Sequence, residues 1–301
     1  MSGLTTAGRV GAVWMDGALV DPAAAHLPVL SFGLHNAACV FEGIRSFGGR
    51  PFALSAHVNR LRTSAEAIGI ALPWDSTEIA DAIETAVAAA DFAEAYIRPV
   101  VWRGDEVIGI DPTGTTVHLA IAVLAWPKQA LDDGKPLRLG LSRWTRPTPT
   151  MAPVQAKTSA NYLVGSLALA EARAGGFDDA LLLDHTGGIA ETTGSNIFLV
   201  HRGELLTPPA HTFLNGITRQ TVLRLAARNG IVTREIRLTP NDLVIADEVF
   251  VTGTAVGVRS VGWFRDTAFH ADGILTRMLA NAYTQLVGAE QGEESPCTAS
   301  A

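Results

Sequence analysis

The stretch Gln155-Ala156-Lys157-Thr158-Ser159-Ala160-Asn161-Tyr162 is the part of this chain from which its fold and chemistry can be argued. The 301 residues include only three lysines, and Lys157 alone lies among small residues, just before a long apolar helical pattern. Lys128 and Lys135 stand in polar, proline-containing segments that are typical of turns. Partial desolvation by such small neighbours lowers the pKa of a lysine from about 10.4 towards the range where its amine is nucleophilic. Lys157 is therefore a candidate for forming a Schiff base with a carbonyl compound.

The composition indicates a globular protein with one large or two medium domains. Hydrophobic residues make up 48% of the chain and charged residues 18%. No run approaches the roughly 18 to 20 apolar residues of a membrane span, and the first residues do not resemble a secretory signal. The net charge of -7 offers no basic surface for nucleic acid or an acidic membrane. Two cysteines, Cys39 and Cys297, form no disulfide framework, so we expect a cytoplasmic protein without nucleic-acid or membrane partners.

Residues 1–127 are predicted to form a small N-terminal α/β domain. The pairs Asp16-Gly17 and Gly48-Gly49 are flanked by apolar runs, which indicates two β-hairpins. Ser55 is expected to cap a helix in which apolar residues recur at helical spacing from Val58 to Ile68. The other predicted elements of this half are a helix over 76–90 and strands over 95–102 and 117–126.

Residues 137–291 are predicted to form a larger C-terminal domain. The stretch from Pro127 to Pro136 is short and polar and carries two prolines and a glycine, so 128–136 is predicted to be the interdomain linker, and 292–301 is predicted to be a disordered tail. The predicted helices of the larger domain cover 162–174 and 216–229. Its predicted strands cover 137–144, 180–184, 197–200 and 248–252.

Three further segments carry residues suited to an anionic, heterocyclic ligand. A helix that begins after Asn215-Gly216 offers free N–H groups and a positive dipole end, which suit a phosphate. Gly253-Thr254-Ala255, at a strand end, is a weaker anion site of the same kind. Glu191, among small polar residues, could face a cationic ring. Taken singly, these features are better explained as a plain helix start, a turn and a solvated loop acid, just as Tyr162 alone reads as a packing residue and Arg60 as a surface cation.

Taken together and in order, the segments resemble the class IV (fold type IV) aminotransferases that use pyridoxal 5′-phosphate, and most closely the branched-chain amino acid aminotransferases. The resemblance covers nearly the whole chain. It rests on His35, Phe41-Glu42-Gly43-Ile44-Arg45, His57-Val58-Asn59-Arg60-Leu61, Ala95-Tyr96-Ile97-Arg98-Pro99, Lys157 with Asn161-Tyr162, Glu191, Asn196, Leu214-Asn215-Gly216-Ile217-Thr218-Arg219, Ala246-Asp247-Glu248-Val249-Phe250 and Gly253-Thr254-Ala255. It implies an α/β (α+β) fold of two domains with the active site at their interface, and a homodimer or higher homo-oligomer.

The resemblance also implies a role for each matched residue. Lys157 would be the catalytic residue, holding the cofactor as a Schiff base and then moving a proton on the substrate adduct. Glu191 would keep the pyridine nitrogen protonated, and Tyr162 would hydrogen-bond the ring oxygen O3′. The remaining cofactor-binding residues, which would hold the phosphate and one ring face, are Arg60, Leu214, Gly216, Ile217, Thr218 and Thr254. No metal site is predicted.

The substrate is less closely defined than the cofactor. Arg98 matches the arginine that meets the distal carboxylate of glutamate, so glutamate and 2-oxoglutarate are the expected donor pair, with a branched-chain L-amino acid as the partner substrate. The expected substrate-binding residues are Phe41, Tyr96, Arg98, Thr254, Ala255 and Asn36.

Two departures from the family pattern keep other substrates open. Asn36 stands where a tyrosine commonly follows the histidine, and Val256-Gly257-Val258-Arg259-Ser260 replaces the usual run after Ala255. A bulkier, aromatic or non-protein amino acid is therefore an alternative substrate. An aminodeoxychorismate lyase shares the fold and the lysine, and a D-amino acid or amine transaminase is a further alternative. The run Phe41-Glu42-Gly43-Ile44-Arg45 favours the branched-chain aminotransferases over both.

Overall fold

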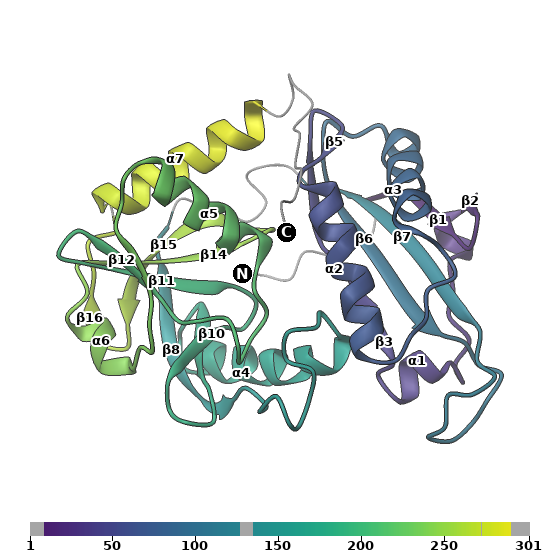
Figure 1. The fold of residues 1–301 in the computed structure, drawn as a ribbon, viewed down its shortest axis with the longest axis horizontal. Coiled ribbons are helices and arrows are strands. Elements are labelled where there is room, and N and C mark those ends of the chain that lie inside the picture. The colour runs from purple at the N-terminus through teal and green to yellow at the C-terminus, as the bar shows by residue number, and fades with distance from the viewer. Residues whose placement is uncertain (1–8, 127–134, 272, 290–301) are drawn as a thin grey trace.

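Two β-sheets, one from each half of the chain, form the frame of the protein (Figure 1). The structure is a computed structural model that describes residues 9–126, 135–271 and 273–289. Seven strands precede residue 127 and form the first sheet, and nine strands that follow residue 134 form the second. The predicted linker and the predicted disordered tail lie mostly or wholly outside the described residues, so both boundaries stay predictions.

The first sheet is antiparallel, with the strand order β2-β1-β7-β6-β4-β5, and β3 pairs with β6. Its strands are β1 (Val10–Met15), β2 (Ala18–Val20), β3 (Cys39–Phe41), β4 (Ile44–Phe47), β5 (Arg50–Pro51), β6 (Glu94–Arg103) and β7 (Val117–Ala125). The helices of this half are η1 (Pro22–Ala24), α1 (Phe32–His35), α2 (Leu54–Ala67) and α3 (Ser76–Ala90). Side chains alternate along β6, so Ala95 and Ile97 are buried in the core with α2 and α3, whereas Tyr96 and Arg98 face the other way.

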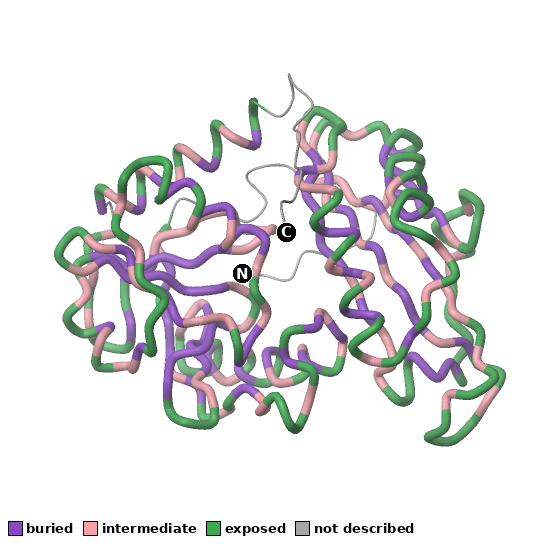
Figure 2. The backbone as a smooth tube through the Cα atoms, in the orientation of Figure 1, coloured by how far each residue is buried: buried purple, intermediate pink, exposed green. Residues whose placement is uncertain are grey.

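The second sheet is mixed, with the order β10-β9-β8-β15-β14-β11-β12-β13, and β16 pairs with β15. Its strands are β8 (Leu137–Thr145), β9 (Asp179–Leu183), β10 (Ile189–Thr192), β11 (Asn196–His201), β12 (Glu204–Thr207), β13 (Thr233–Glu235), β14 (Glu248–Gly253), β15 (Gly257–Phe264) and β16 (Thr267–Ala268). The helices are η3 (Ser159–Asn161), α4 (Tyr162–Ala174), α5 (Ile217–Arg228), α6 (Pro240–Val244) and α7 (Ile274–Ala289). Strand β11 is buried on both faces, since Phe198 packs with α5 and α7 and Ile197 packs in a second core (Figure 2).

Most predicted elements are present, and the differences have local causes. Asp16 and Gly17 both have positive φ, as the hairpin prediction requires. The expected cap at Ser55 is wrong, because α2 begins at Leu54 after Ala53, which takes a left-handed conformation and makes no side-chain cap. The segment with Glu191 is strand β10 rather than a loop. It pairs with β9, which lies close in sequence, through an irregular register that no local sequence signal indicates.

The two halves meet along the segment that carries Lys157. Val40 of β3 forms an isolated antiparallel bridge with Thr158, and the Phe41 N–H donates to the Lys157 carbonyl at 3.1 Å. The Lys157 N–H in turn donates to Ser64 Oγ of α2 at 2.9 Å. These backbone contacts hold the lysine of the second half against the first sheet.

Candidate functional site

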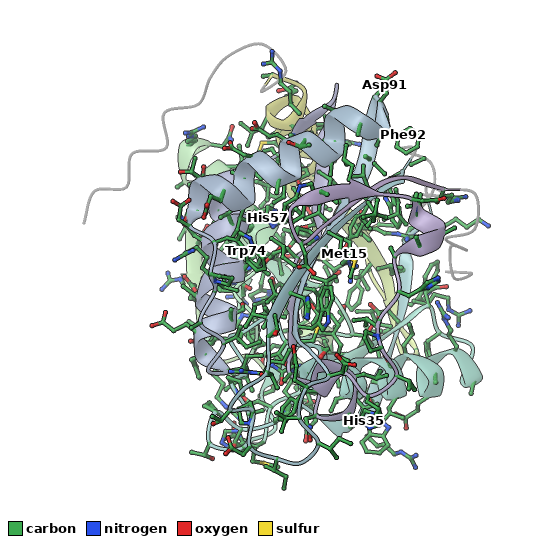
Figure 3. The ribbon with its side chains drawn as sticks, turned by 90° about the vertical axis from the view of Figure 1, so that its right-hand side faces the viewer. Met15, His35, His57, Trp74, Asp91 and Phe92 are labelled. Carbon is green, nitrogen blue, oxygen red and sulfur yellow. The ribbon has the colours of Figure 1, made fainter. Side chains whose placement is uncertain are left out.

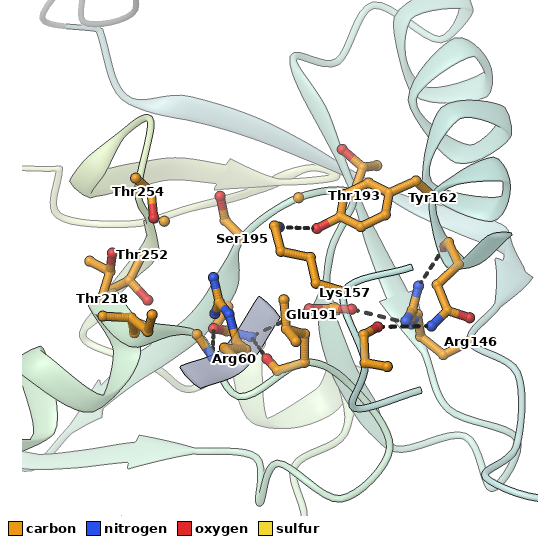
Figure 4. Close-up of a pocket in the computed structure, with 18 residues that line it drawn as sticks. Arg60, Arg146, Lys157, Tyr162, Glu191, Thr193, Ser195, Thr218, Thr252 and Thr254 are labelled. Carbon is orange, nitrogen blue, oxygen red and sulfur yellow. Dashed lines mark hydrogen bonds and ion pairs between the residues drawn. The ribbon is translucent and has the colours of Figure 1, made fainter. Parts of the chain in front are cut away.

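A cavity lies between the two halves of the chain, and all the predicted cofactor-binding residues line it (Figure 4). These residues are Arg60, Lys157, Tyr162, Glu191, Leu214, Gly216, Ile217, Thr218 and Thr254. Among the described residues that line the cavity, Arg60 is the one contributed by the first half of the chain. The cavity therefore forms only where the two halves come together.

Lys157 reaches into this cavity towards Tyr162. Its Nζ donates a hydrogen bond to the Tyr162 hydroxyl at 2.5 Å, a contact that Figure 4 shows as a dashed line. Burial lowers the pKa of Lys157 to about 8, and the nearby charges of Arg60 and Arg98 act in the same direction while Glu42 opposes them. Burial raises the pKa of Tyr162 to about 12. Lys157 thus has the weakened basicity that a nucleophilic amine requires near neutral pH.

Glu191 lies beside a buried arginine that sequence reasoning missed. The Arg146 Nε is 3.2 Å from Glu191 Oε1, and Arg146 Nη1 donates to the Asn161 carbonyl at 3.0 Å. Burial raises the pKa of Glu191 to about 7, although the positive charges of Arg146 and Lys157 both lower it. A carboxylate in such surroundings binds a cationic nitrogen more strongly than an exposed one, because little water screens the pair.

Asn196 connects the Glu191 side of the cavity to the start of helix α5. Its Nδ2 donates to Glu191 Oε2 at 3.3 Å and to the Leu214 carbonyl at 3.0 Å, while its Oδ1 accepts from the Gly216 N–H at 3.1 Å. A Cβ on Gly216 would lie 2.3 Å from Asn196 Oδ1, so this close approach requires glycine. One amide side chain therefore sets the distance between the acid and the helix N-terminus.

The first turn of α5 and three threonines form the opposite side of the cavity. No side chain caps the N-terminus of α5, and its first turn contains no acidic residue, so its N–H groups and dipole are available to an anion. Figure 4 shows Thr218, Thr252 and Thr254 together on one side of the view, with Arg60 between them and Lys157. Within the described part of the chain, the buried hydroxyl of Thr252 has no hydrogen-bond partner.

Three of the predicted substrate residues lie together beside the lysine. The ring of Phe41 lies 4.8 Å from that of Tyr162, and the Lys157 Nζ lies 4.9 Å from the centre of the Phe41 ring. The Arg98 guanidinium covers Phe41 at 4.6 Å and donates to the Tyr96 hydroxyl at 2.7 Å. A cation, two aromatic rings and a hydroxyl are thus grouped next to the reactive amine.

The other residues proposed for substrate binding are placed less directly. Asn36 is exposed at the end of α1, where its Nδ2 donates to the Gly109 carbonyl at 3.1 Å, and it is not among the described residues that line the cavity. Ala255 directly follows the cavity residue Thr254 but does not itself line the cavity. Arg259 donates to the Lys135 carbonyl at 3.1 Å and is not among the described residues that line the cavity. A role for Asn36 or Ala255 in binding substrate stays a prediction.

Arg146, Thr252 and the loop residues Thr193 to Ser195 also line the cavity but were not singled out from the sequence. Arg146 follows the end of β8, in a segment over 141–152 that contains neither a glycine nor an acidic residue to suggest a site. Thr252 could have been found, because it lies on β14 two residues before Thr254, and side chains at that spacing point to the same side of an extended chain.

Comparison with known protein families agrees with this arrangement. The family model described as amino-transferase class IV matches residues 39–262. The probable branched-chain-amino-acid aminotransferase of Rickettsia felis is 41% identical over 249 residues, which are 83% of this chain and 85% of that protein. The branched-chain-amino-acid aminotransferase of Pseudomonas aeruginosa is 38% identical over 294 residues, which cover 94% and 95% of the two chains.

Solved structures show the same fold. The branched-chain aminotransferase of Thermoproteus uzoniensis, crystallised with norvaline, superposes with a TM-score of 0.89 at 35% identity and covers 94% of this chain and 96% of its own. The T.th. branched-chain amino acid aminotransferase with pyridoxamine 5′-phosphate has a TM-score of 0.89 at 34% identity, with coverages of 93% and 94%. Within the described residues, no helix combines the length and the apolar character needed to cross a membrane.

Proposed function

The chain belongs to the class IV aminotransferases, which use pyridoxal 5′-phosphate, and from this premise we propose that it exchanges the amino group between a branched-chain L-amino acid and 2-oxoglutarate through Lys157. The observation that carries the proposal is the Nζ of Lys157, whose pKa is lowered to about 8 by burial and which is hydrogen-bonded to Tyr162 in a cavity that also contains Glu191.

The cavity fits pyridoxal 5′-phosphate at both of its ends. The uncapped N-terminus of α5, the Thr252 hydroxyl without a partner and the guanidinium of Arg60 form a donor set suited to a phosphate. Glu191 supplies a carboxylate for the pyridine nitrogen, and Tyr162 supplies a hydroxyl for O3′. Gly216 keeps the backbone near the phosphate end free of a side chain that would meet Asn196. Leu214 would pack against one face of the ring.

The residues of this chain would divide the catalytic work. The bound cofactor supplies a ring that accepts the electron pair left when the substrate loses its α-proton. Lys157 would hold the cofactor covalently and, once displaced by the substrate amine, its Nζ would move the proton, a task typically worth about 10² to 10⁴ in rate. Glu191 would keep the pyridine nitrogen cationic, and Arg146 would keep Glu191 ionised while it does so. Tyr162 would hold Nζ in place between these steps.

Phe41 and Arg98 support the choice of substrates. Phe41 presents an apolar ring beside Nζ, which suits a branched aliphatic side chain. Arg98, fixed by Tyr96 and stacked on Phe41, offers a charge to the distal carboxylate of glutamate. The T.th. relative has been solved both with 4-methylvaleric acid and with N-(5′-phosphopyridoxyl)-L-glutamate, so that protein accepts both kinds of group.

The proposal is tested by trapping and by half-reactions. Borohydride reduction of the yellow, cofactor-loaded protein followed by peptide mapping should label Lys157 alone. L-leucine, L-isoleucine, L-valine and L-glutamate, added singly, should each bleach the visible band, and 2-oxoglutarate should restore it. A label on another residue would refute the role of Lys157. Bleaching by aromatic donors in preference to the aliphatic ones would replace the branched-chain substrate with the bulkier alternative.

We also propose that the protein works as a homodimer. Large apolar side chains are exposed on the adjoining segments 27–34 and 108–110, which the Asn36–Gly109 hydrogen bond ties together. They are Leu27, Val29, Leu30, Leu34, Ile108 and Ile110. A contiguous apolar patch is typical of an interface. Sedimentation should give a dimer, and replacement of Val29 and Ile110 by aspartate should give a monomer. Dimers that survive both changes would place the interface elsewhere.

A further inference from the structure

Glu42 is a wholly buried carboxylate that lies outside the cavity yet contacts Arg60, the cavity residue of the first half. It occupies the connection between β3 and β4, where its N–H donates to the Pro99 carbonyl of β6 at 2.8 Å. This backbone bond fixes the carboxylate relative to the first sheet. A buried acid is costly unless it is paired and hydrogen-bonded, so its place beside the cavity calls for a physical reason.

The contact between Glu42 and Arg60 is bidentate. Arg60 Nε donates to Oε1 at 2.6 Å, and Nη2 donates to Oε2 at 2.8 Å. This fork-to-fork geometry fixes the plane of the guanidinium as well as its position. It uses two of the three guanidinium nitrogens and leaves Nη1 for the cavity, which Arg60 lines together with Thr218 and Thr254.

His57 holds the other side of the carboxylate. It lies one turn before Arg60 on α2, its Nδ1 is 2.7 Å from Glu42 Oε2, and it is 1% exposed. Figure 3 shows His57 within the body of the structure, whereas His35 lies near its edge. Burial lowers the pKa of His57, so its ring is neutral and Nδ1 donates. Burial raises the pKa of Glu42, but the positive charge of Arg60 and the hydrogen bonds from Arg60 and His57 more than offset this and hold it well below its usual range.

We propose that Glu42, held in place by His57, is a positioning residue that orients the guanidinium of Arg60 towards the phosphate group of the cofactor. The inference rests on the proposed function and deepens it, since it names a residue through which the first sheet controls phosphate binding. Two contacts made before the ligand arrives remove most of the rotamer freedom of Arg60, and the entropy lost on phosphate binding is correspondingly smaller. Pairing with Glu42 also allows the guanidinium to remain largely buried while the site awaits an anion.

The test compares pyridoxal 5′-phosphate with pyridoxal, which lacks the phosphate. Both dissociation constants are measured on the apoprotein by tryptophan fluorescence. The dissociation constant of pyridoxal divided by that of pyridoxal 5′-phosphate reports how much the phosphate group contributes to binding, and its measurement requires no turnover. Glu42→Gln should lower that ratio about tenfold or more, because a hydrogen bond to a charged group is lost. Arg60→Met should lower it as well, and the double variant should fall no further than Arg60→Met, since Glu42 acts only through Arg60.

Two more variants separate positioning from folding. Glu42→Asp keeps the buried charge paired but withdraws the carboxylate by one methylene, so it should fold and still lose phosphate preference. Glu248→Gln is the matched control, because Glu248 is also a buried carboxylate but accepts from the Leu275 and Thr276 N–H groups of α7. It should lower the melting temperature and leave the ratio within about twofold of the wild type.

The outcomes distinguish the inference from the proposed function. An unchanged ratio in Glu42→Gln and Glu42→Asp, with a lower ratio in Arg60→Met, would overturn the inference alone. Equal losses for pyridoxal and its phosphate in both Glu42 variants would also overturn it, since they would show a purely structural role. A wild-type protein that binds neither compound, or an Arg60→Met variant with the wild-type ratio, would overturn the phosphate site of the proposed function.

Discussion

The Nε of Arg146 lies 3.2 Å from Oε1 of Glu191, and both side chains are almost fully buried. This pair sits at the end of the cavity opposite the threonines (Figure 4). Because burial raises the pKa of Glu191 to about 7 despite Arg146 and Lys157, the acid changes its charge close to neutral pH in the protein without cofactor. The charge state of Glu191 should therefore be measurable through stability as well as through catalysis.

Glu191→Gln should change how the stability of the apoprotein depends on pH. The folded pKa of Glu191, about 7, lies above its ordinary value of 4.5, so between these values the folded state holds more protons than the unfolded state. The free energy of unfolding of the wild type should fall as pH rises through this window and level off above it. Urea titrations at intervals from pH 4 to 8 should show that Glu191→Gln lacks this contribution. If the free energy of unfolding varied with pH in the same way in the wild type and in Glu191→Gln, the raised pKa of Glu191 would be contradicted.

Arg146→Met should shift to higher pH the range over which the free energy of unfolding falls. Loss of the guanidinium removes a charge that lowers the pKa of Glu191, so stability should continue to fall above pH 7. The turnover number at neutral pH should fall more than the affinity for substrate, because a protonated Glu191 cannot keep the pyridine nitrogen cationic. Arg143→Met is the control, since Arg143 is exposed and pairs with Glu171. A normal turnover number in Arg146→Met would remove Arg146 from the catalytic scheme.

The lowered pKa of Lys157 predicts the pH dependence of cofactor attachment. With a pKa of about 8, roughly a tenth of the amine is neutral at pH 7, against less than about a thousandth for an ordinary lysine. The rate at which apoprotein and pyridoxal 5′-phosphate develop visible absorbance should rise with pH and level off near pH 8. Stopped-flow absorbance between pH 6 and 10 measures this directly. A rate still rising steeply at pH 10 would show that burial does not lower the pKa of this amine.

Gly216→Ala should weaken binding at the phosphate end of the site. The added Cβ would meet Asn196 Oδ1 at 2.3 Å, which displaces either the N-terminus of α5 or the amide that bridges to Glu191. The dissociation constant for pyridoxal 5′-phosphate should rise about tenfold or more, in line with a loss of one or two hydrogen bonds. Gly288→Ala, where a Cβ meets no neighbour, should leave binding unchanged. Equal affinities for the two variants would mean that the Asn196 bridge adjusts freely.

The sequence predicted those parts of the site that are encoded by local signals. The two hairpins follow from turn residues that tolerate positive φ, and the helix over 162–174 was predicted with the bounds that α4 has. Lys157 and the start of α5 were found because small residues and helix-start signals surround them, whereas Tyr162 was singled out only by the family resemblance. All the predicted cofactor-binding residues line one cavity, although the role of each stays a prediction.

The remainder depends on contacts between segments that are distant in sequence. Arg146 and Glu191 are 45 positions apart by number, and nothing near either residue indicates the other. Glu42 was recognised only as part of a motif, because its pairing with Arg60 depends on how β3 packs beside α2. Asn36 was expected near the substrate, and its side chain donates to the Gly109 carbonyl at the end of the short helix α1, so its role stays a prediction. Periodicity and turn chemistry carry no information about such pairings.

The backbone bridge between Val40 and Thr158 bears on how this gene can recombine with those of its relatives. The strand segment that aligns the lysine is inherited with the first half, and the lysine itself is inherited with the second. A chimera joined between residues 126 and 135 must therefore combine two halves whose main chains can still form the hydrogen bonds around Val40 and Thr158. Between distant homologues, chimeras joined at this point should be folded but inactive more often than chimeras joined within either half.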